Sequence, residues 1–231
     1  MDRRVEPELL DELPPEDARA RRSRRDLHRI NAWMGNARLL ARALRPVCDR
    51  SPPQRLVDLG AGDGRLLWRV ARLCAPDWNG TRVLLLDRQE TVAPEVRAGL
   101  KGSGWEVETL TADVLGWLRQ PMTPVWDVML ANLFLHHFAE AQLAELLGAA
   151  AARTRAFVTV EPRRSPWALL FSRLVGVIGC NAVTRHDAPV SVRAGFAGNE
   201  LSRLWPAGKG WVLEERSAGW FSHLFVARRS G

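Results

Sequence analysis

The chain has 231 residues, enough for one large domain or for one domain with additional cap elements. Its hydrophobic fraction of 46% supports a sizeable core, but no apolar run is long enough to cross a membrane. The formal net charge is +7, yet only Lys101 and Lys209 of the 33 basic residues are lysines, and tyrosine is absent. This arginine-rich composition is typical of GC-rich coding, so the basic charge alone does not indicate a nucleic-acid partner.

Residues 1–22 are acidic, contain prolines and lack an apolar signal-peptide core. We therefore expect a flexible tail on a cytoplasmic protein. The cysteines, Cys48, Cys74 and Cys180, are widely spaced and odd in number, which indicates neither a disulfide framework nor a metal site. Cys74 falls on an expected core face, so we interpret it as a buried thiol.

Residues 23–50 have the pattern of a helical cap. Ser23 and Asp26 match an S-x-x-D capping motif, after which apolar residues recur at helical spacing. The segment is one amphipathic helix, or two helices hinged at Gly35. The arginine cluster at 18–29 has two interpretations, a solvated helix start or an RNA-facing patch, and we favour the first.

From residue 55 onward, short apolar runs alternate with helical patterns. The expected strands are 55–59, 82–87, 105–110, 126–131 and 156–161, with helices between them. Strands that alternate with helices imply right-handed crossovers and a parallel sheet covered on both faces. The sequence therefore predicts an α/β domain over residues 55–231.

The end of the chain departs from this alternation. The runs 211–218 and 221–229 are separated by a short turn and are expected to pair antiparallel. The segment 162–209 is too long for a simple connection, so we interpret it as a cap insertion. It contains an apolar helix at 165–179 and a polar, loop-like stretch at 184–196.

The stretch LVDLGAGDGRLL, residues 56–67, lies between the first strand and the first helix of this domain. A dinucleotide fingerprint, G-x-G-x-x-G, would need glycine at Arg65, whereas the third glycine comes one place earlier, at Gly64. Gly60 and Gly62 let a ligand lie against the backbone. The loop therefore favours a nucleoside-type cofactor over a dinucleotide.

Acidic residues at the strand ends support the same interpretation. Asp58 and Asp63 bring negative charge to the loop, which disfavours a phosphate and suits a cationic group. Asp87 ends the second strand, where a carboxylate accepts the hydroxyls of an unphosphorylated ribose. Asp113 follows the third strand and could accept the amine of an adenine, although strand-end aspartates also serve as helix caps.

Together, the segments VDLGAGDG, LLLD, TADV and VMLANLFLHHF resemble those of the class I S-adenosylmethionine-dependent methyltransferases. The resemblance covers residues 55–161, and the two closing strands extend it to about 229. It implies a seven-stranded, mostly parallel sheet with helices on both faces. In that sheet the last strand lies antiparallel between its neighbours, and the helical cap elements are added to it.

The resemblance also implies S-adenosylmethionine as the cofactor, with Asp58 near its amino group, Asp87 on its ribose, and Asp113 with Val114 on its adenine. The full expected cofactor-binding set is Asp58, Gly60, Ala61, Gly62, Gly64, Asp87, Arg88, Asp113, Val114 and Asn132. The stretch NLFLHHF resembles small-molecule methyltransferases of the quinone-biosynthesis type. ANLF lacks both prolines of the motif that amino-methylating nucleic-acid enzymes carry after the asparagine, which favours oxygen or carbon acceptors.

Methyl transfer needs an aligned acceptor and, for a phenol, a base within reach. We expect catalytic roles for His136, His137 and His186, although the first two could simply begin a helix. Substrate contacts are expected from Trp33, Glu161, Asp187 and Arg193. For Glu161, a role as the cap of the next helix is weighed equally with a substrate contact. The stretch 184–196 has the alternative of a surface loop without a substrate role.

The sequence thus predicts an enzyme that methylates a small hydroxylated metabolite, aromatic, polyketide or quinone-like, most simply on oxygen. The N-terminal helix and 165–179 would form an apolar lid. Two alternatives stay open, an RNA-modifying methyltransferase that uses the arginine cluster and a cofactor-binding partner subunit without catalysis. No metal, nucleic acid or membrane span is expected, and the sequence does not predict an oligomeric state.

Overall fold

The structure, a computed structural model, describes all residues except 49–50, 76, 122–124, 207, 209 and 231. Residues 49 and 50, at the end of the expected N-terminal cap, therefore lie outside the described residues. None of the described helices is both long enough and apolar enough to cross a membrane.

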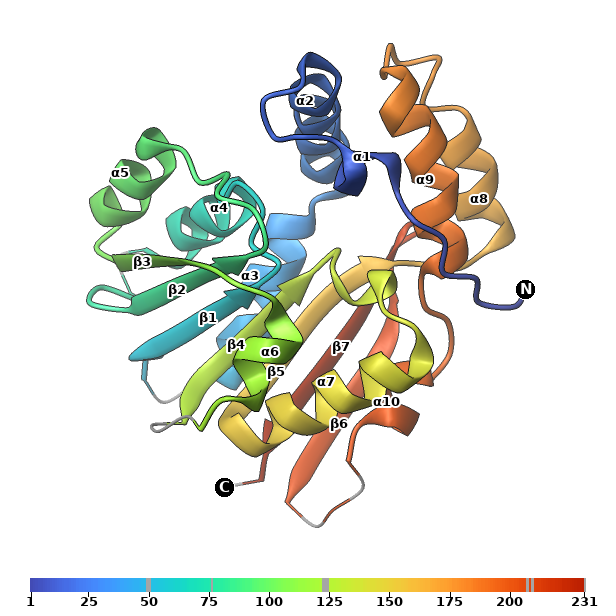
Figure 1. Ribbon diagram of the computed structural model, residues 1–231. Coiled ribbons are helices and arrows are strands. Elements are labelled where there is room, and N and C mark those ends of the chain that lie inside the picture. Colours follow the sequence, from blue (N-terminus) through green and yellow to red (C-terminus); the bar gives the residue numbers. More distant parts are fainter. Residues whose placement is uncertain (49–50, 76, 122–124, 207, 209, 231) are drawn as a thin grey trace.

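One seven-stranded sheet organises the molecule (Figure 1). Its strands are β1 Arg55–Leu59, β2 Arg82–Asp87, β3 Glu106–Thr111, β4 Trp126–Asn132, β5 Thr154–Pro162, β6 Trp211–Ala218 and β7 Ser222–Arg229. They lie in the order β3-β2-β1-β4-β5-β7-β6. β7 runs antiparallel to both of its neighbours, and the other pairs are parallel. The expected topology is confirmed.

Helices cover both faces of the sheet (Figure 1). One face carries α3 Asn36–Val47, α4 Arg65–Cys74 and α5 Pro94–Gly102, and the other carries α6 Val114–Arg119, α7 Glu140–Arg153 and α10 Glu200–Leu204. Because side chains alternate along a strand, Leu56 of β1 packs into the first of these cores while Val57 and Leu59 pack into the second. Cys74 is buried in the first core.

The remaining helices form a cap above the carboxyl ends of the parallel strands (Figure 1). They are α1 Leu9–Glu12, α2 Ala18–Met34, α8 Pro166–Arg173 and α9 Ala182–Ala194, with the short 3-10 helix η1 Leu135–His137 below them. Gly35 separates α2 from α3 with φ of 72°, a left-handed conformation that glycine adopts at little cost. Of the two alternatives for this segment, the structure shows two helices that meet at Gly35.

The start of α2 differs from the expected capping motif. The helix begins at Ala18, and the carboxylate of Asp17 accepts the backbone N–H of Arg19 as its cap. Ser23 and Asp26 lie inside the helix and are buried. Ser23 Oγ is 2.9 Å from Oγ1 of Thr184, and Asp26 accepts the N–H of Asn181 at 2.8 Å. These two polar residues therefore hold α2 against α9.

Two expectations for the insertion 162–209 are wrong in detail. The apolar helix ends at Arg173 rather than 179, and turns that include Gly179, with φ of 80°, follow it. The stretch 184–196 is not a loop, because α9 occupies most of it. Asn181 caps α9 by accepting the N–H of Thr184 at 2.9 Å.

The N-terminal segment also differs from the expected loose tail. The Arg3 guanidinium donates to the carbonyls of Phe138 and Ala194, at 2.9 and 2.8 Å. The carboxylate of Asp187 in α9 accepts the N–H groups of Leu9 and Leu10. Residues 1–12 are thereby packed against α9 and η1, next to the carboxyl edge of the sheet.

Candidate functional site

A cavity of about 790 Å³ lies between the cap and the carboxyl edge of the sheet. Its acidic end is lined by the glycine loop and by the ends of β1 and β2, including Asp58 and Asp87. Its apolar end is lined by α2, α8 and the turn before β7, including Met34, Phe171 and Phe221. The cavity thus offers a polar, acidic half and an apolar half.

The glycine loop is tight because each of its glycines has positive φ, at 68° for Gly60, 55° for Gly62 and 74° for Gly64. A Cβ on Gly60 would lie 2.1 Å from the Phe134 ring. A Cβ on Gly62 would meet no atom and would extend into the open space above the loop. Gly64 instead faces Val96 and does not line the cavity, so it serves packing under the loop.

Asp58 is the unusual group of the acidic end. It is buried at 6% exposure, and its carboxylate accepts no hydrogen bond from the described residues. Burial, and next the charge of Asp87, raise the pKa of Asp58 to about 7. A buried acid with no protein partner that faces a cavity is arranged to receive a cation from a ligand.

Asp87 and Asp113 each accept hydrogen bonds from backbone N–H groups, and each carboxylate can accept further hydrogen bonds. Asp87 accepts the N–H of Gly62 at 2.8 Å and that of Gln89 at 3.0 Å, which fixes the loop. Asp113 caps α6 by accepting the N–H of Gly116 at 2.8 Å. Carboxylates have about four lone-pair sites, so both can also accept from a bound nucleoside.

The other expected cofactor residues line the same end. Ala61, Arg88 and Val114 all lie on the cavity wall. Asn132, at the end of β4, leaves its buried Oδ1 without a partner among the described atoms. Leu133 follows with φ of 51°, the one positive φ among the described non-glycine residues, and such strain is often found at binding sites.

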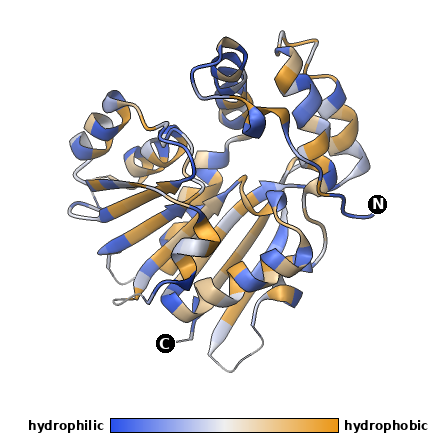
Figure 2. Cartoon of the chain, in the orientation of Figure 1, coloured by the Kyte–Doolittle hydropathy of each residue, from blue (hydrophilic) through white to orange (hydrophobic). Residues whose placement is uncertain are grey.

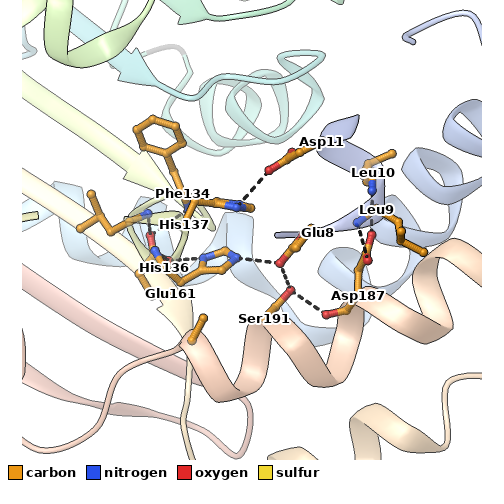
Figure 3. Close-up of polar contacts among 12 residues, drawn as sticks. Glu8, Leu9, Leu10, Asp11, Phe134, His136, His137, Glu161, Asp187 and Ser191 are labelled. Carbon is orange, nitrogen blue, oxygen red and sulfur yellow. Dashed lines mark hydrogen bonds and ion pairs between the residues drawn. The ribbon is translucent and has the colours of Figure 1, made fainter. Parts of the chain in front are cut away.

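His136 lies in a buried polar network (Figure 3). Its Nδ1 is 2.8 Å from Oε2 of Glu161, and its Nε2 is 3.4 Å from Oε1 of Glu8. Burial lowers the pKa of His136, but the two carboxylates outweigh burial and raise the pKa to about 9. His136 is therefore a positively charged link between β5 and the N-terminal segment, and its charge makes it unsuited to accept a proton near neutral pH.

His137 has a different environment. Its Nδ1 is 3.2 Å from Oδ2 of Asp11, and its side chain, which lines the cavity, is 25% exposed (Figure 3). If Nδ1–H donates to Asp11, Nε2 carries the lone pair that can take a proton. This is the orientation that a general base requires.

Glu8, His136 and His137 are also a possible metal-ligand set, because one ligand atom from each lies within 4.8 Å of the other two. Glu161 on the far nitrogen of His136 would be the outer carboxylate that metal-bound histidines commonly have. A protonated His136 contacts both carboxylates without an ion, so the geometry alone does not require a metal.

Glu161 does not line the cavity, and its role differs from both alternatives considered for it. It is fully buried and accepts the N–H groups of Phe134 and Leu135, each at 3.0 Å. It therefore holds the start of η1, which carries His136 and His137, instead of capping the next helix.

The structure does not bring every expected substrate residue to the cavity. Trp33 lines it at the outer rim and is 73% exposed. Asp187, His186 and Arg193 of α9 are not among its lining residues. Asp187 holds residues 9 and 10, and His186 Nδ1 lies 2.9 Å from that same carboxylate.

Sequence reasoning missed several residues that line the cavity. Glu8 and Asp11 come from a segment expected to be loose. His28 Nε2 lies 2.6 Å from Oδ2 of Asp63, and Arg24 donates to the side chain of Gln89 at 3.1 Å. Both bonds link α2 to the loops of the acidic end, so one arginine of the cluster, Arg24, belongs to the cavity wall.

No family model matches the sequence, and no curated protein sequence matches it. Solved structures do match the fold. A protein of the O-methyltransferase family from Burkholderia thailandensis aligns over 94% of this chain and 61% of its own, with 19% identity and a TM-score of 0.59. The plantazolicin methyltransferase BpumL, solved with SAH, aligns over 93% of this chain and 92% of its own, with 12% identity and a TM-score of 0.66.

The fold is the class I methyltransferase fold. A third similar structure is the magnesium protoporphyrin IX methyltransferase from Synechocystis PCC 6803 (14% identity, TM-score 0.53), which aligns over 85% of this chain and 83% of its own. The present chain spans 61% of the length of the Burkholderia protein. Within the methyltransferase fold, the carboxyl edge of the sheet is where ligands of open α/β sheets bind, and the cavity lies at that edge.

Proposed function

We propose that the chain is an S-adenosylmethionine-dependent methyltransferase that acts on an oxygen of a small hydroxylated acceptor. The observation that carries the proposal is the unpartnered, buried carboxylate of Asp58 beside the open backbone of Gly62. The methionine part of the cofactor has an ammonium group that would supply the missing cation. The raised pKa of Asp58 would fall when that cation binds.

The other groups of the acidic end support the same ligand. Asp87 would accept from the ribose hydroxyls, and Asp113 with Val114 would receive the adenine. Arg65 is salt-bridged to Asp63, at 3.3 Å, and to Glu95, at 3.0 Å, so it is not available to bind a pyrophosphate. The orphaned Oδ1 of Asn132 is a further acceptor on the wall next to this end.

Bound S-adenosylmethionine supplies an electrophilic methyl group on a sulfonium. The protein then has to hold an acceptor oxygen in line with it and to take the proton of that oxygen. In our proposal His137 accepts this proton at Nε2, and Asp11 holds the ring by its contact with Nδ1. His136 stays charged and positions His137 through the shared helix η1.

Aromatic side chains near His137 support an aromatic, polyketide or quinone-like acceptor. Phe134 and Phe138 meet edge-on, with ring centroids 5.0 Å apart, and both line the cavity near His137. Flat apolar walls of this kind bind rings better than they bind a charged nucleic-acid backbone. The proposal is therefore a small-molecule enzyme rather than an RNA-modifying enzyme.

Incubation with S-adenosylmethionine labelled in its methyl group, together with a panel of phenols and hydroxyquinones, tests the proposal by mass spectrometry. We expect a labelled methyl ether from at least one hydroxylated ring compound. Labelling of RNA alone, with strong salt dependence, would overturn the proposed acceptor class. Binding of S-adenosylhomocysteine without transfer to any acceptor would favour the non-catalytic partner subunit.

A further inference from the structure

Large apolar side chains are exposed on α2, on α8, on the turn after α8 and on the turn before β7, and we call six of them the apolar rim. Its members are Trp33, Trp167, Phe171, Val177, Ile178 and Trp220. Their exposed fractions run from 39% for Phe171 to 84% for Val177. An apolar patch this exposed is unfavourable in water and commonly marks a surface that something else covers.

Several members of the apolar rim are linked by contacts between different elements. The rings of Trp33 in α2 and Phe221 before β7 have centroids 5.2 Å apart. Phe171 of α8 lies 5.5 Å from Phe221 and 6.4 Å from Trp220, measured between ring centroids. The carbonyl of Ile178 accepts from Arg29 of α2 at 3.3 Å. These contacts join α2, α8, the turn after α8 and the turn before β7.

Positive charge is concentrated near the turn after α8, at one end of the apolar rim. Residues 162–186 contain four arginines and no aspartate or glutamate. Arg173 and Arg185 are exposed and form no ion pair with the described residues. Arg22 lies beside residues 181–183, at the same end of the cap. Figure 2 shows the strongly hydrophilic α2 next to the apolar segments of the α8–α9 pair.

Part of the apolar rim also lines the cavity. Its members Trp33 and Phe171 are lining residues, and so is Phe221, whose ring packs against both of them. Met34 and Val175 continue the apolar lining inward. Apolar side chains therefore extend from part of the rim into the cavity that His137 also lines.

We propose that the apolar rim and its arginines dock the protein onto a membrane surface rich in anionic lipid. Val177 and Ile178 stand on a projecting turn, which suits insertion between lipid headgroups. Tryptophan is favoured at the boundary between hydrocarbon and water, and each nearby arginine adds attraction to anionic headgroups. A protein partner would instead need a complementary hollow lined with acidic side chains around this turn.

The docking surface also indicates a class of substrate. This second part of the inference rests on the proposed function. The acceptor would be an amphipathic phenol or quinol with a long apolar chain, taken directly from the membrane. Its hydroxylated ring would reach the site of His137 while its chain stayed along Met34 and Phe171. Docking onto a membrane does not depend on methyl transfer, so an experiment can reject one of the two proposals without rejecting the other.

Sedimentation of the full chain with vesicles tests the docking. We expect the protein to sediment with vesicles of equal parts phosphatidylglycerol and phosphatidylcholine, but only weakly with phosphatidylcholine alone. Val177→Asp should reduce the partition coefficient by roughly tenfold or more. Arg173→Gln with Arg185→Gln should reduce it by roughly 30-fold on the mixed vesicles.

Matched controls are Val125→Asp, at the opposite edge of the sheet, and the pair Arg72→Gln with Arg228→Gln, all at exposed positions away from the apolar rim. Absence of binding to the mixed vesicles, or equal losses in the control variants, would overturn the proposal. Sedimentation equilibrium gives a further check. If Val177→Asp converted a dimer into a monomer, the apolar rim would be a protein interface and docking on lipid would be wrong.

Discussion

The Nδ1 atom of His136 lies 2.8 Å from Oε2 of Glu161, and both side chains are buried. On the other side of the ring, Nε2 lies 3.4 Å from Oε1 of Glu8, whose carboxylate also accepts from Ser191. One charged imidazole thus connects the end of β5 to the N-terminal segment that forms part of the cavity wall (Figure 3).

This network predicts a pH-dependent stability. The pKa of His136 is raised from 6.5 to about 9, so the proton stabilises the folded state fully below pH 6.5. The stabilisation is lost as the pH rises through about 9, and the loss is on the order of 3 kcal/mol. Urea unfolding across this range measures it. We expect His136→Gln to flatten the pH dependence, and an unchanged pH profile in that variant would contradict the assignment.

We expect a substitution of Asp58 to raise the stability of the ligand-free protein while it weakens cofactor binding. Asp58→Asn removes an unpartnered buried charge, so the unfolding free energy of the ligand-free protein should rise by about 1–3 kcal/mol at neutral pH. The same change should weaken S-adenosylhomocysteine binding by roughly 10- to 100-fold, because a charged hydrogen bond is lost. Thermal unfolding and calorimetry measure the two effects.

Asp63→Asn is the matched control for Asp58. Its carboxylate is already bonded to His28, and this contact, against the effect of burial, lowers the pKa of Asp63. We therefore expect Asp63→Asn to reduce stability. Loss of stability in both variants would mean that Asp58 is an ordinary structural acid.

The glycine loop gives a test that separates backbone strain from ligand contact. Gly62 and Gly80 both have positive φ, and a Cβ on either would meet no protein atom. Alanine at each position should therefore cost a similar amount, about 1–2 kcal/mol. Only Gly62→Ala should also weaken S-adenosylhomocysteine binding, and Gly62→Val should abolish it. Equal binding by the Gly62 and Gly80 variants would place the cofactor elsewhere.

The assignment of the base predicts a kinetic signature. His137→Gln should lower kcat by roughly 10²–10⁴ with an accepted hydroxylated substrate, while the affinity for S-adenosylhomocysteine stays unchanged. Asp11→Asn should lower kcat less, because it removes only the group that orients the ring. His186→Gln, outside the cavity, is the control. Normal kinetics in the His137 variant would show that alignment alone suffices and that no base is used.

The sheet was predictable because its signals are local. Apolar runs such as 82–87 and 126–131, separated by helical patterns, indicate parallel strands, and the glycines after β1 mark the ligand loop. The short turn between 211–218 and 221–229 indicates that these strands pair antiparallel. The placement of β7 between its two neighbours is implied by the family resemblance, since spacing alone does not determine it. An aspartate at a strand end does not by itself distinguish a helix cap from a ligand contact. Asp113 illustrates this, because it caps α6 and also lines the cavity.

The cap was less predictable, because its contacts are long-range. Ser23 and Asp26 match a capping motif, but their partners lie in α9, more than 150 residues away. α9 contains a proline, Pro189, which is unfavourable inside a helix, so the local helical signal of this polar stretch is weak. Asp11 lies in the short helix α1 and Glu8 directly precedes it. Asp187 holds this helix, and no local pattern indicates that contact.

The central claim is that the acidic end of the cavity binds S-adenosylmethionine. Titration calorimetry of the purified chain with S-adenosylhomocysteine and, separately, with NAD tests it most directly. We predict that S-adenosylhomocysteine binds, with an affinity that rises as the pH passes about 7 and Asp58 ionises, and that NAD does not bind. Tighter binding of NAD than of S-adenosylhomocysteine would contradict it.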